Sequence, residues 1–487
     1  MAISPGAGIN TRAGTSGAYR RLVPLITSVA VALALGLLLS QLGYAAAAMV
    51  FTAIAVAFAA MLSPYWALVI GIAQWAFIPS EGAFFSIGRT PNQLQFIGPL
   101  LVIVAFLQAL KDRAHDRLRP RLTDYTVGAI GVWGLVGLIL NDVRFVSQRW
   151  YVNRMFLPTS FYYAVRLIDL NRERFDTLLK VALGAVSLQA ILMIRQSWAG
   201  SSPIYSMRSG TIEGVRAATG PFPFYWNAGT FLALWPPVFI YMIANARTRR
   251  SRWLWSAGLL LVLVASTRTM MRGSVAASLL AILVCLLSSQ LRRTTGRVIA
   301  VLAVAFIPWS LGAAGSGLMD RFDQTDESRV AYRTAAVNLL KSDDWNPIYG
   351  IGWSAGYRRI GHYGTNQQVV AWGEHRGSIA EIAEGSQIHN VWLAMAVELG
   401  GVGVLLALAV IVPAIAATLR ILRRAREHPL NTGLLTAVWA SLIALGAIGY
   451  YQNIWHYPAS MSVMWLLYGT IVSKPNVFDL DDSADSS

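Results

Sequence analysis

Residues 390–418 read NVWLAMAVELGGVGVLLALAVIVPAIAAT, and Glu398 is the only charged side chain among them. A helix needs about 20 apolar residues to cross the hydrocarbon core of a bilayer, so this run predicts a transmembrane helix. Thirteen more apolar runs follow the same pattern. The predicted spans are 22–41, 43–62, 64–80, 95–110, 123–141, 154–170, 176–196, 223–245, 252–267, 272–290, 297–315, 390–418, 431–451 and 457–473. We therefore expect an all-α, polytopic membrane protein with about fourteen helices, because a β-barrel would show alternating segments of about ten residues.

The composition agrees with this assignment. Hydrophobic residues make up 55% of the 487 residues and charged residues 13%, whereas soluble proteins contain about 25% charged residues. These values argue against a soluble enzyme, a disordered protein and a nucleic-acid-binding protein. The one cysteine, Cys285, excludes an internal disulfide and any metal site built from several cysteines.

The formal net charge of +16 arises from basic residues that cluster between apolar runs. Cytoplasmic loops are enriched in Lys and Arg, so these clusters indicate the orientation of the chain. With the N-terminus in the cytoplasm, every strongly basic cluster falls in a cytoplasmic connection. The clusters are Lys111 to Arg121, Arg172 to Lys180, Arg247 to Arg252, Arg292 to Arg297 and Arg420 to Arg426. An even number of spans then returns the C-terminus to the cytoplasm.

These assignments divide the chain into five segments. They are a cytoplasmic N-terminal tail (1–21), eleven spans (22–315), a large outer loop (316–389), three further spans (390–473) and an acidic cytoplasmic tail (474–487). The run that follows Arg20 and Arg21 would also fit a cleaved export signal, but its length favours an uncleaved first span. Loops as long as the outer one are uncommon and are usually functional.

The outer loop contains one predicted helix and one predicted turn. Residues 326–341 begin with capping residues and carry apolar residues at helical spacing, which predicts an amphipathic helix. Arg329 and Arg333 are four residues apart and therefore share one face of this helix. The sequence Asn346-Pro347-Ile348-Tyr349-Gly350-Ile351-Gly352-Trp353 predicts a helix stop followed by a tight, glycine-rich turn.

Three blocks of residues between about 255 and 405 carry a resemblance to a known family. They are Ser328 to Ala336 with Pro347 to Gly352, His389-Asn390 with Glu398-Leu399-Gly400, and Ser266 to Gly273, which contains Arg268 and Arg272. Together they resemble the Arg-led helix with its Pro-x-x-Gly-x-Gly turn, the His-Asn and Glu-x-Gly motifs, and the Ser-Arg turn of one superfamily. This is the O-antigen ligase and polymerase superfamily of bacterial membrane glycosyltransferases.

The resemblance implies a reaction and a location. Such proteins move a glycan from undecaprenyl diphosphate to an acceptor sugar hydroxyl at the periplasmic face of the bacterial inner membrane. The acceptor is lipid A–core in ligases and the next lipid-linked repeat unit in polymerases, and these residues do not distinguish the two. Nucleotide sugars take no part, and we expect neither a cofactor nor a required metal.

This chemistry needs cations at the leaving group and a base at the acceptor. The resemblance implies diphosphate binding by Arg329 and by Arg268 or Arg272; snorkelling to lipid headgroups is the alternative for the latter two. Arg333 is a further diphosphate candidate, with a salt bridge to a loop aspartate as the alternative. His389, at the loop–membrane junction, is predicted to act as general base or to orient the acceptor, and a structural interfacial histidine is its alternative.

Two other features bear on the site. Glu398 follows His389 by nine residues, or 900° at about 100° per residue, so the two side chains face apart on a straight helix and we do not pair them. An aromatic cluster at an outer boundary is typical of an interface belt, with sugar stacking as the alternative. Its members are Tyr450, Tyr451, Trp455, His456 and Tyr457.

The rival function is a transporter or flippase of lipid-linked glycans, which would also have many spans and outer arginines. Against it stand the single large loop with its histidine, the lack of a visible internal repeat and the small number of charges in the middle of spans.

Overall fold

The structure is a computed structural model, and it describes part of the 487-residue chain. The described residues are 63–73, 94–141, 152–200, 210–212, 215–222, 225–310, 327–353, 363, 388–424 and 431–479. All of them belong to a compact unit that comprises Phe58–Ser487. The predicted N-terminal tail and the predicted spans 22–41 and 43–62 lie outside the described residues.

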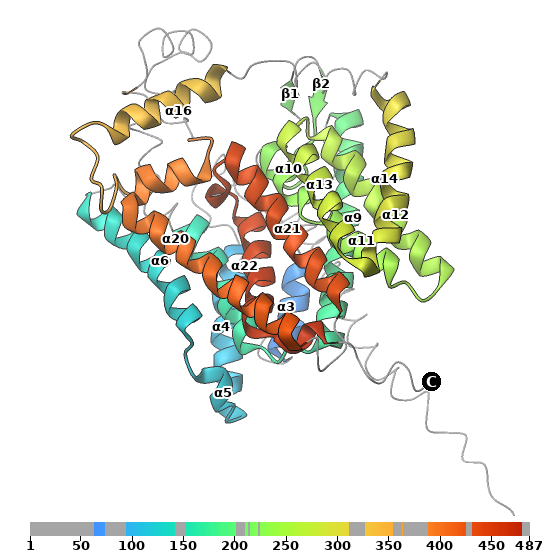
Figure 1. The fold of residues 1–487 in the computed structure, drawn as a ribbon, viewed down its shortest axis with the longest axis horizontal. Coiled ribbons are helices and arrows are strands. Elements are labelled where there is room, and N and C mark those ends of the chain that lie inside the picture. Colours follow the sequence, from blue (N-terminus) through green and yellow to red (C-terminus); the bar gives the residue numbers. More distant parts are fainter. Residues whose placement is uncertain are drawn as a thin grey trace, which may run out of the picture. The chain divides into compact units, whose positions relative to one another are not determined.

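Helices make up nearly all of the described structure (Figure 1). The first half contains α3 (Pro64–Ala73), α4 (Leu94–Lys111), α5 (His115–Leu118), α6 (Leu122–Leu140), the π-helical turn η2 (Val152–Phe156), α8 (Leu157–Leu167), α9 (Arg172–Ala199), and the strands β1 (Gly210–Ile212) and β2 (Val215–Ala217). The second half contains α10 (Tyr225–Ala233), α11 (Pro236–Ala244), α12 (Arg249–Arg268), α13 (Arg272–Val284), η3 (Cys285–Leu287), α14 (Ser289–Ser310), α16 (Glu327–Leu340), α20 (Val391–Arg424), α21 (Thr432–Tyr451), η5 (Ile454–His456), α22 (Pro458–Ser473) and η6 (Pro475–Phe478).

Several predicted elements coincide with observed helices. The predicted spans 95–110, 123–141, 431–451 and 457–473 differ from α4, α6, α21 and α22 by one residue at most at each end. The amphipathic helix predicted at 326–341 is confirmed as α16, one residue shorter at each end. The length of the apolar runs was sufficient for the four spans. Apolar spacing and capping residues were sufficient for α16.

The predicted span 223–245 is divided in the structure. Helix α10 ends at Ala233 and α11 begins at Pro236, so the span consists of two short helices. The reason is the pair Pro236-Pro237, because proline lacks a backbone N–H and its ring disfavours a helical residue before it. Hydropathy alone did not predict this break, since both halves are apolar.

The structure supports a helical membrane protein. Among the described residues, five helical stretches are long and apolar enough to cross a bilayer: His115–Leu140, Arg172–Ala199, Tyr225–Ala244, Val391–Arg424 and Thr432–Tyr451. On α4, the exposed side chains Ile103, Leu107 and Leu110 recur at four- and three-residue spacing, which places them on one apolar face. The number of fourteen spans stays a prediction.

The packed bundle extends beyond the last predicted span. The tail was predicted to begin at residue 474, whereas Val477 and Phe478 in η6 are fully buried. Phe478 O accepts the backbone N–H of Asn431 at 2.8 Å, and Val477 O accepts an Arg172 guanidinium N–H at 3.0 Å. These two apolar side chains therefore complete the core, and residues 480–487 lie outside the described part.

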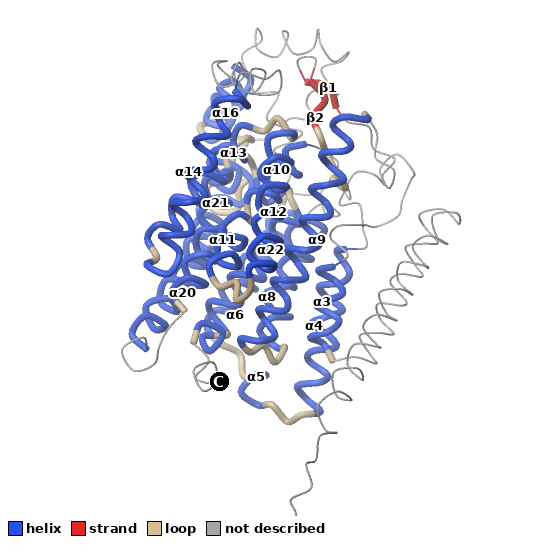
Figure 2. Tube along the Cα trace, turned by 90° about the vertical axis from the view of Figure 1, so that its right-hand side faces the viewer, coloured by secondary structure: helices blue, strands red, loops and turns tan. Residues whose placement is uncertain are grey.

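Helix α16 packs on the first half of α20 (Figure 1). A small core joins them, in which Ala336 and Leu339 of α16 contact Val397 of α20 and the neighbouring Ile351 and Ile388. Figure 2 shows α16 and the β-hairpin at one end of the helices and α5 at the other. We call these the α16 end and the α5 end.

Helix α20 is interrupted at Gly400, whose φ of 67° and ψ of −169° are not helical. A regular helix would bond the N–H groups of the next residues to carbonyls four positions back. Instead, Gly401 N–H donates to Pro347 O at 2.7 Å, and Val402 N–H donates to Ile348 O at 3.4 Å. The glycine-rich turn after α16 therefore supplies the acceptors that the interrupted helix lacks.

The same turn supplies donors to the other side of the interruption. Ile351 N–H donates to Val397 O at 3.0 Å, and Gly352 N–H donates to Glu398 O at 3.0 Å. Non-helical backbone at membrane depth is tolerated only where protein groups or water satisfy it. The turn thus allows α20 to change direction inside the bundle without leaving these carbonyls unpaired.

Two tryptophans complete the hydrogen bonding of the interruption. Trp345 Nε1–H donates to Ala396 O at 3.2 Å, and Trp133 Nε1–H from α6 donates to Leu399 O at 3.0 Å. Figure 1 shows α6 beside α20, and the two helices are in contact. Four consecutive carbonyls before Gly400 therefore have donors from outside the helix.

Replacement of Gly400 by alanine is expected to destabilise the protein by about 2–4 kcal/mol. The positive φ disfavours any side chain, and an added Cβ would lie 2.4 Å from Ile348 O. Gly446→Ala is the matched control, because a Cβ there meets no atom within 4 Å and alanine favours the helical state of α21. Thermal unfolding midpoints in one detergent measure both effects. Equal midpoints for the two variants would contradict this account of the interruption.

Candidate active site

His389 lies immediately before α20, where the chain enters the bundle. Its Nδ1 is 3.0 Å from Gln452 Oε1, and Tyr457 donates its hydroxyl proton to the same oxygen at 3.0 Å. An amide oxygen only accepts, so the His389–Gln452 hydrogen bond requires the proton on Nδ1. In the neutral imidazole the basic lone pair is then on Nε2.

The ring of His389 also contacts α16. The centroids of the His389 and Tyr332 rings are 5.5 Å apart, with an angle of 52° between the planes. The imidazole is thus held from two directions, by Gln452 after α21 and by Tyr332 of α16. Both contacts restrict the orientation of the ring, which is a requirement for a general base.

Asn390 fixes the backbone next to the histidine. Its side-chain oxygen accepts the N–H of Leu393 at 2.9 Å and so caps the start of α20. Its side-chain amide donates to Tyr450 O at 3.1 Å. The two residues of the His-Asn pair therefore have different roles. Asn390 connects the start of α20 to α21 by hydrogen bonds, and His389 places its imidazole next to this connection.

Arg333 reaches the same end of α21. Its guanidinium carbon is 5.3 Å from the centroid of the Tyr450 ring, and Nη2 donates to Tyr450 O at 3.4 Å. Because Tyr332 touches His389 and Asn390 also bonds Tyr450 O, the structure brings Arg333 and His389 to one place. Neither described loop aspartate, Asp343 or Asp344, forms an ion pair with Arg333. The loop aspartates Asp320, Asp323 and Asp326 lie outside the described residues, so the alternative salt bridge stays a prediction.

Arg333 and the segment that follows Gln452 carry buried polar atoms without a hydrogen-bond partner among the described residues. Within the described part of the chain, Arg333 Nε, Asn453 Oδ1 and Trp455 Nε1 are buried and lack a hydrogen-bond partner. A buried polar atom of this kind costs about 1–3 kcal/mol unless another group satisfies it. The arrangement is therefore suited to a polar molecule that supplies both donors and acceptors.

Arg154 belongs to this neighbourhood as well. It lies in η2, and this π-helical turn packs against η5, the short helix that follows Gln452. π-Helical turns within α-helices are frequent at functional sites. The π-helical turn was not predicted, because such a turn has no characteristic periodicity in the sequence.

Arg268 and Arg272 occupy a different turn, where α12 ends and α13 begins. Both side chains are half-buried, and Arg268 O accepts the N–H of Ala218, which follows β2, at 2.8 Å. The turn contains Met270 in a left-handed conformation, with φ of 56°, and strained residues of this kind cluster at functional sites. Figures 1 and 2 show this β-hairpin and α16 at the same end.

The structure describes the other predicted residues of the outer loop only in part. Arg329 lies in the first turn of α16, and the structure describes its backbone but not its side chain. Of the predicted loop 316–389, residues 327–353, Tyr363 and 388–389 are described. Glu398 is buried at 3% exposure, next to the interruption of α20.

Sequence reasoning missed Gln452 and Tyr332 as partners of His389. Gln452 is separated from the histidine by 63 positions, and no pattern linked it to the loop. The aromatic cluster around Tyr450 was visible, but its interpretation as an interface belt did not include Gln452. The sequence feature that could have indicated Gln452 is its position as a polar residue between aromatic residues at the end of a predicted helix.

No protein-family model matches this chain, and a search of curated proteins finds no match.

Replacement of Gln452 by methionine is expected to destabilise the protein by about 1–3 kcal/mol. The change keeps the length of the side chain and removes the acceptor for both His389 Nδ1–H and Tyr457 O–H. Gln189→Met is the matched control, because Gln189 is fully buried and neither of its side-chain polar atoms is hydrogen-bonded to a described residue. That variant should be neutral or stabilising. Unfolding midpoints compare the two, and an equal loss in both would contradict the assigned hydrogen bonds.

Proposed function

We propose that this protein is a membrane glycosyltransferase of the O-antigen ligase or polymerase type. It moves a glycan from undecaprenyl diphosphate to an acceptor sugar hydroxyl. In this proposal the chain has fourteen spans, lies in the bacterial inner membrane, and keeps both termini in the cytoplasm. The α16 end then faces the periplasm.

The observation that carries the proposal is the setting of His389. The hydrogen bond to Gln452 Oε1 directs the lone pair to Nε2, and Tyr332 restrains the ring. A neutral histidine is a base close to physiological pH. Arg333 lies beside it, with a buried Nε that no described group satisfies. A base and a cation in one place are what this transfer needs.

The transfer takes place in one displacement in our proposal. The acceptor hydroxyl gives its proton to Nε2 of His389, and its oxygen forms a bond to the anomeric carbon of the donor sugar. The bond between that carbon and the diphosphate oxygen breaks, and the electron pair leaves with the lipid diphosphate. Guanidinium groups of Arg333 and Arg329, and of Arg268 or Arg272, stabilise the charge on the leaving group.

Purified protein should convert a lipid-linked glycan, and His389→Ala should lower the rate by about 10²–10⁴-fold because it removes the base. His115→Ala is the control, since His115 is an exposed residue of α5 at the other end. Products are resolved on a gel with and without lipid A–core. A ladder without lipid A–core identifies a polymerase, and a shift only with lipid A–core identifies a ligase.

Two outcomes would overturn the enzymatic proposal. One is no product from folded protein with the host's own lipid-linked glycan and either acceptor, which would favour the transporter or flippase. The other is a His389→Ala variant as active as the unmodified protein. Topology and protein level are measured for both variants, so that a loss through misfolding is recognised.

A further inference from the structure

A cavity lies where α6 begins and where α20 and α22 end. Its volume is about 640 Å³, and Arg121, Arg420, Arg423 and Arg424 line it. Ligand pockets typically have volumes of about 300–1,000 Å³. Arg420 is three and four residues before the other two arginines of α20, so these three side chains share one face of the helix. Arg121 is the residue that precedes α6.

The described lining of the cavity concentrates positive charge. None of its described lining residues is acidic, and in the described part of the chain no ion pair joins its arginines to a carboxylate. The nearby Asp124 accepts the backbone N–H of Arg121 at 2.7 Å, and its carboxylate is also engaged by the Tyr162 hydroxyl at 2.6 Å and by Arg166 at 3.4 Å. Four like charges in one cavity repel one another and favour an anion.

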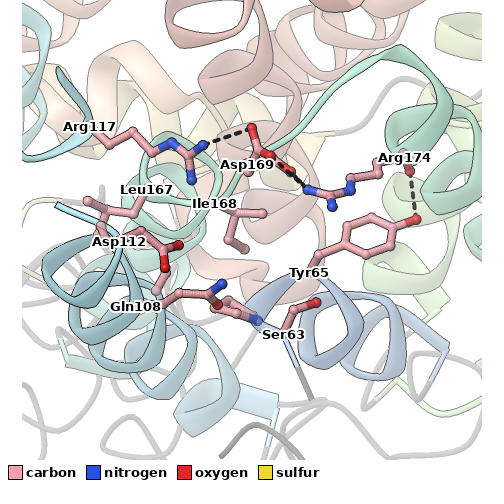
Figure 3. Close-up of a pocket in the computed structure, with 12 residues that line it drawn as sticks. Ser63, Tyr65, Gln108, Asp112, Arg117, Leu167, Ile168, Asp169 and Arg174 are labelled. Atoms are coloured by element: carbon pink, nitrogen blue, oxygen red, sulfur yellow. Dashed lines mark hydrogen bonds and ion pairs between the residues drawn. The ribbon is translucent and has the colours of Figure 1, made fainter. Parts of the chain in front are cut away.

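A neighbouring pocket at the α5 end shows the contrast (Figure 3). There, Asp169 lies between Arg117 and Arg174, with oxygen–nitrogen distances of 3.0 Å to each guanidinium. That pocket has a volume of about 120 Å³, and its charges compensate one another. Some basic residues at this end therefore form ion pairs with a carboxylate. The cavity lined by the four arginines differs, because its described lining contains no acidic residue.

The cavity also has an apolar side. Leu122, which is 79% exposed, and Ile471 line it together with the arginines. Val472 and Pro475, at and just after the end of α22, add further apolar surface to the same cavity. An inorganic anion would satisfy the guanidinium groups alone. A molecule with an anionic head and an apolar chain would match both surfaces.

We propose that this cavity binds the phosphate headgroup of an anionic phospholipid such as phosphatidylglycerol. Guanidinium groups bind phosphate oxygens through paired, charge-assisted hydrogen bonds. Basic pockets between transmembrane helices bind anionic lipid headgroups on the cytoplasmic side of membranes. The site is separate from His389, because Figure 1 shows α20 running from α16 toward the opposite end of the helices.

Native mass spectrometry of the full-length protein in detergent tests this assignment. Phosphatidylglycerol is titrated into the unmodified protein and into the double variant Arg423→Gln/Arg424→Gln. Each basic residue near an anionic lipid contributes about 1 kcal/mol, so the loss of two should raise the apparent dissociation constant roughly thirtyfold. Arg249→Gln/Arg250→Gln is the matched control, because these exposed arginines begin α12, and it should bind as the unmodified protein does.

Two further probes identify the source of the phosphate. Phosphatidylcholine has the same phosphate without net charge and should bind at least tenfold more weakly. Inorganic phosphate added in excess should leave phosphatidylglycerol binding unchanged, and full competition would assign the cavity to a free anion and overturn the lipid proposal. Equal lipid affinity in both double variants would also overturn it. Size-exclusion profiles and unfolding midpoints without lipid establish that each variant is folded.

Discussion

The interruption of α20 at Gly400 is the constraint on which the α16 end depends. A backbone that changes direction inside a bilayer must find donors and acceptors within the protein. The turn at 347–352 supplies them from one side, and Trp133 and Trp345 supply them from others. Since the turn follows α16 directly, the hydrogen bonding of a membrane helix determines where a segment of the loop lies.

The candidate active site follows from this arrangement. With α16 fixed on α20, Tyr332 reaches the His389 ring and Arg333 reaches Tyr450. Gln452 holds the other side of the imidazole from the end of α21. Residues from α16 and from the end of α21 thus contact one histidine, the first by its ring and the second by a hydrogen bond. Such convergence restrains the imidazole more than any single neighbour would.

Sequence analysis was most successful where one helix carries the information. The bounds of α16, α21 and α22 follow from apolar runs and capping residues, and the glycines of the turn were visible as a motif. The partners of that turn were not, because its bonds to Val397 and Glu398 join separate parts of the chain. His389 and Arg333 could be chosen by residue type and position. Gln452 could not, since its role depends on a tertiary contact.

The same long-range bonds have a consequence for biogenesis. Trp133 and Leu399 are 266 positions apart, and the bond from Lys474 Nζ to Ile168 O spans 306. At synthesis rates of about 5–20 residues per second, α6 leaves the ribosome roughly 13–53 seconds before the carbonyl that Trp133 binds. Early helices therefore insert with polar groups that await partners not yet made. These contacts can therefore form only after the late helices that supply them have been translated.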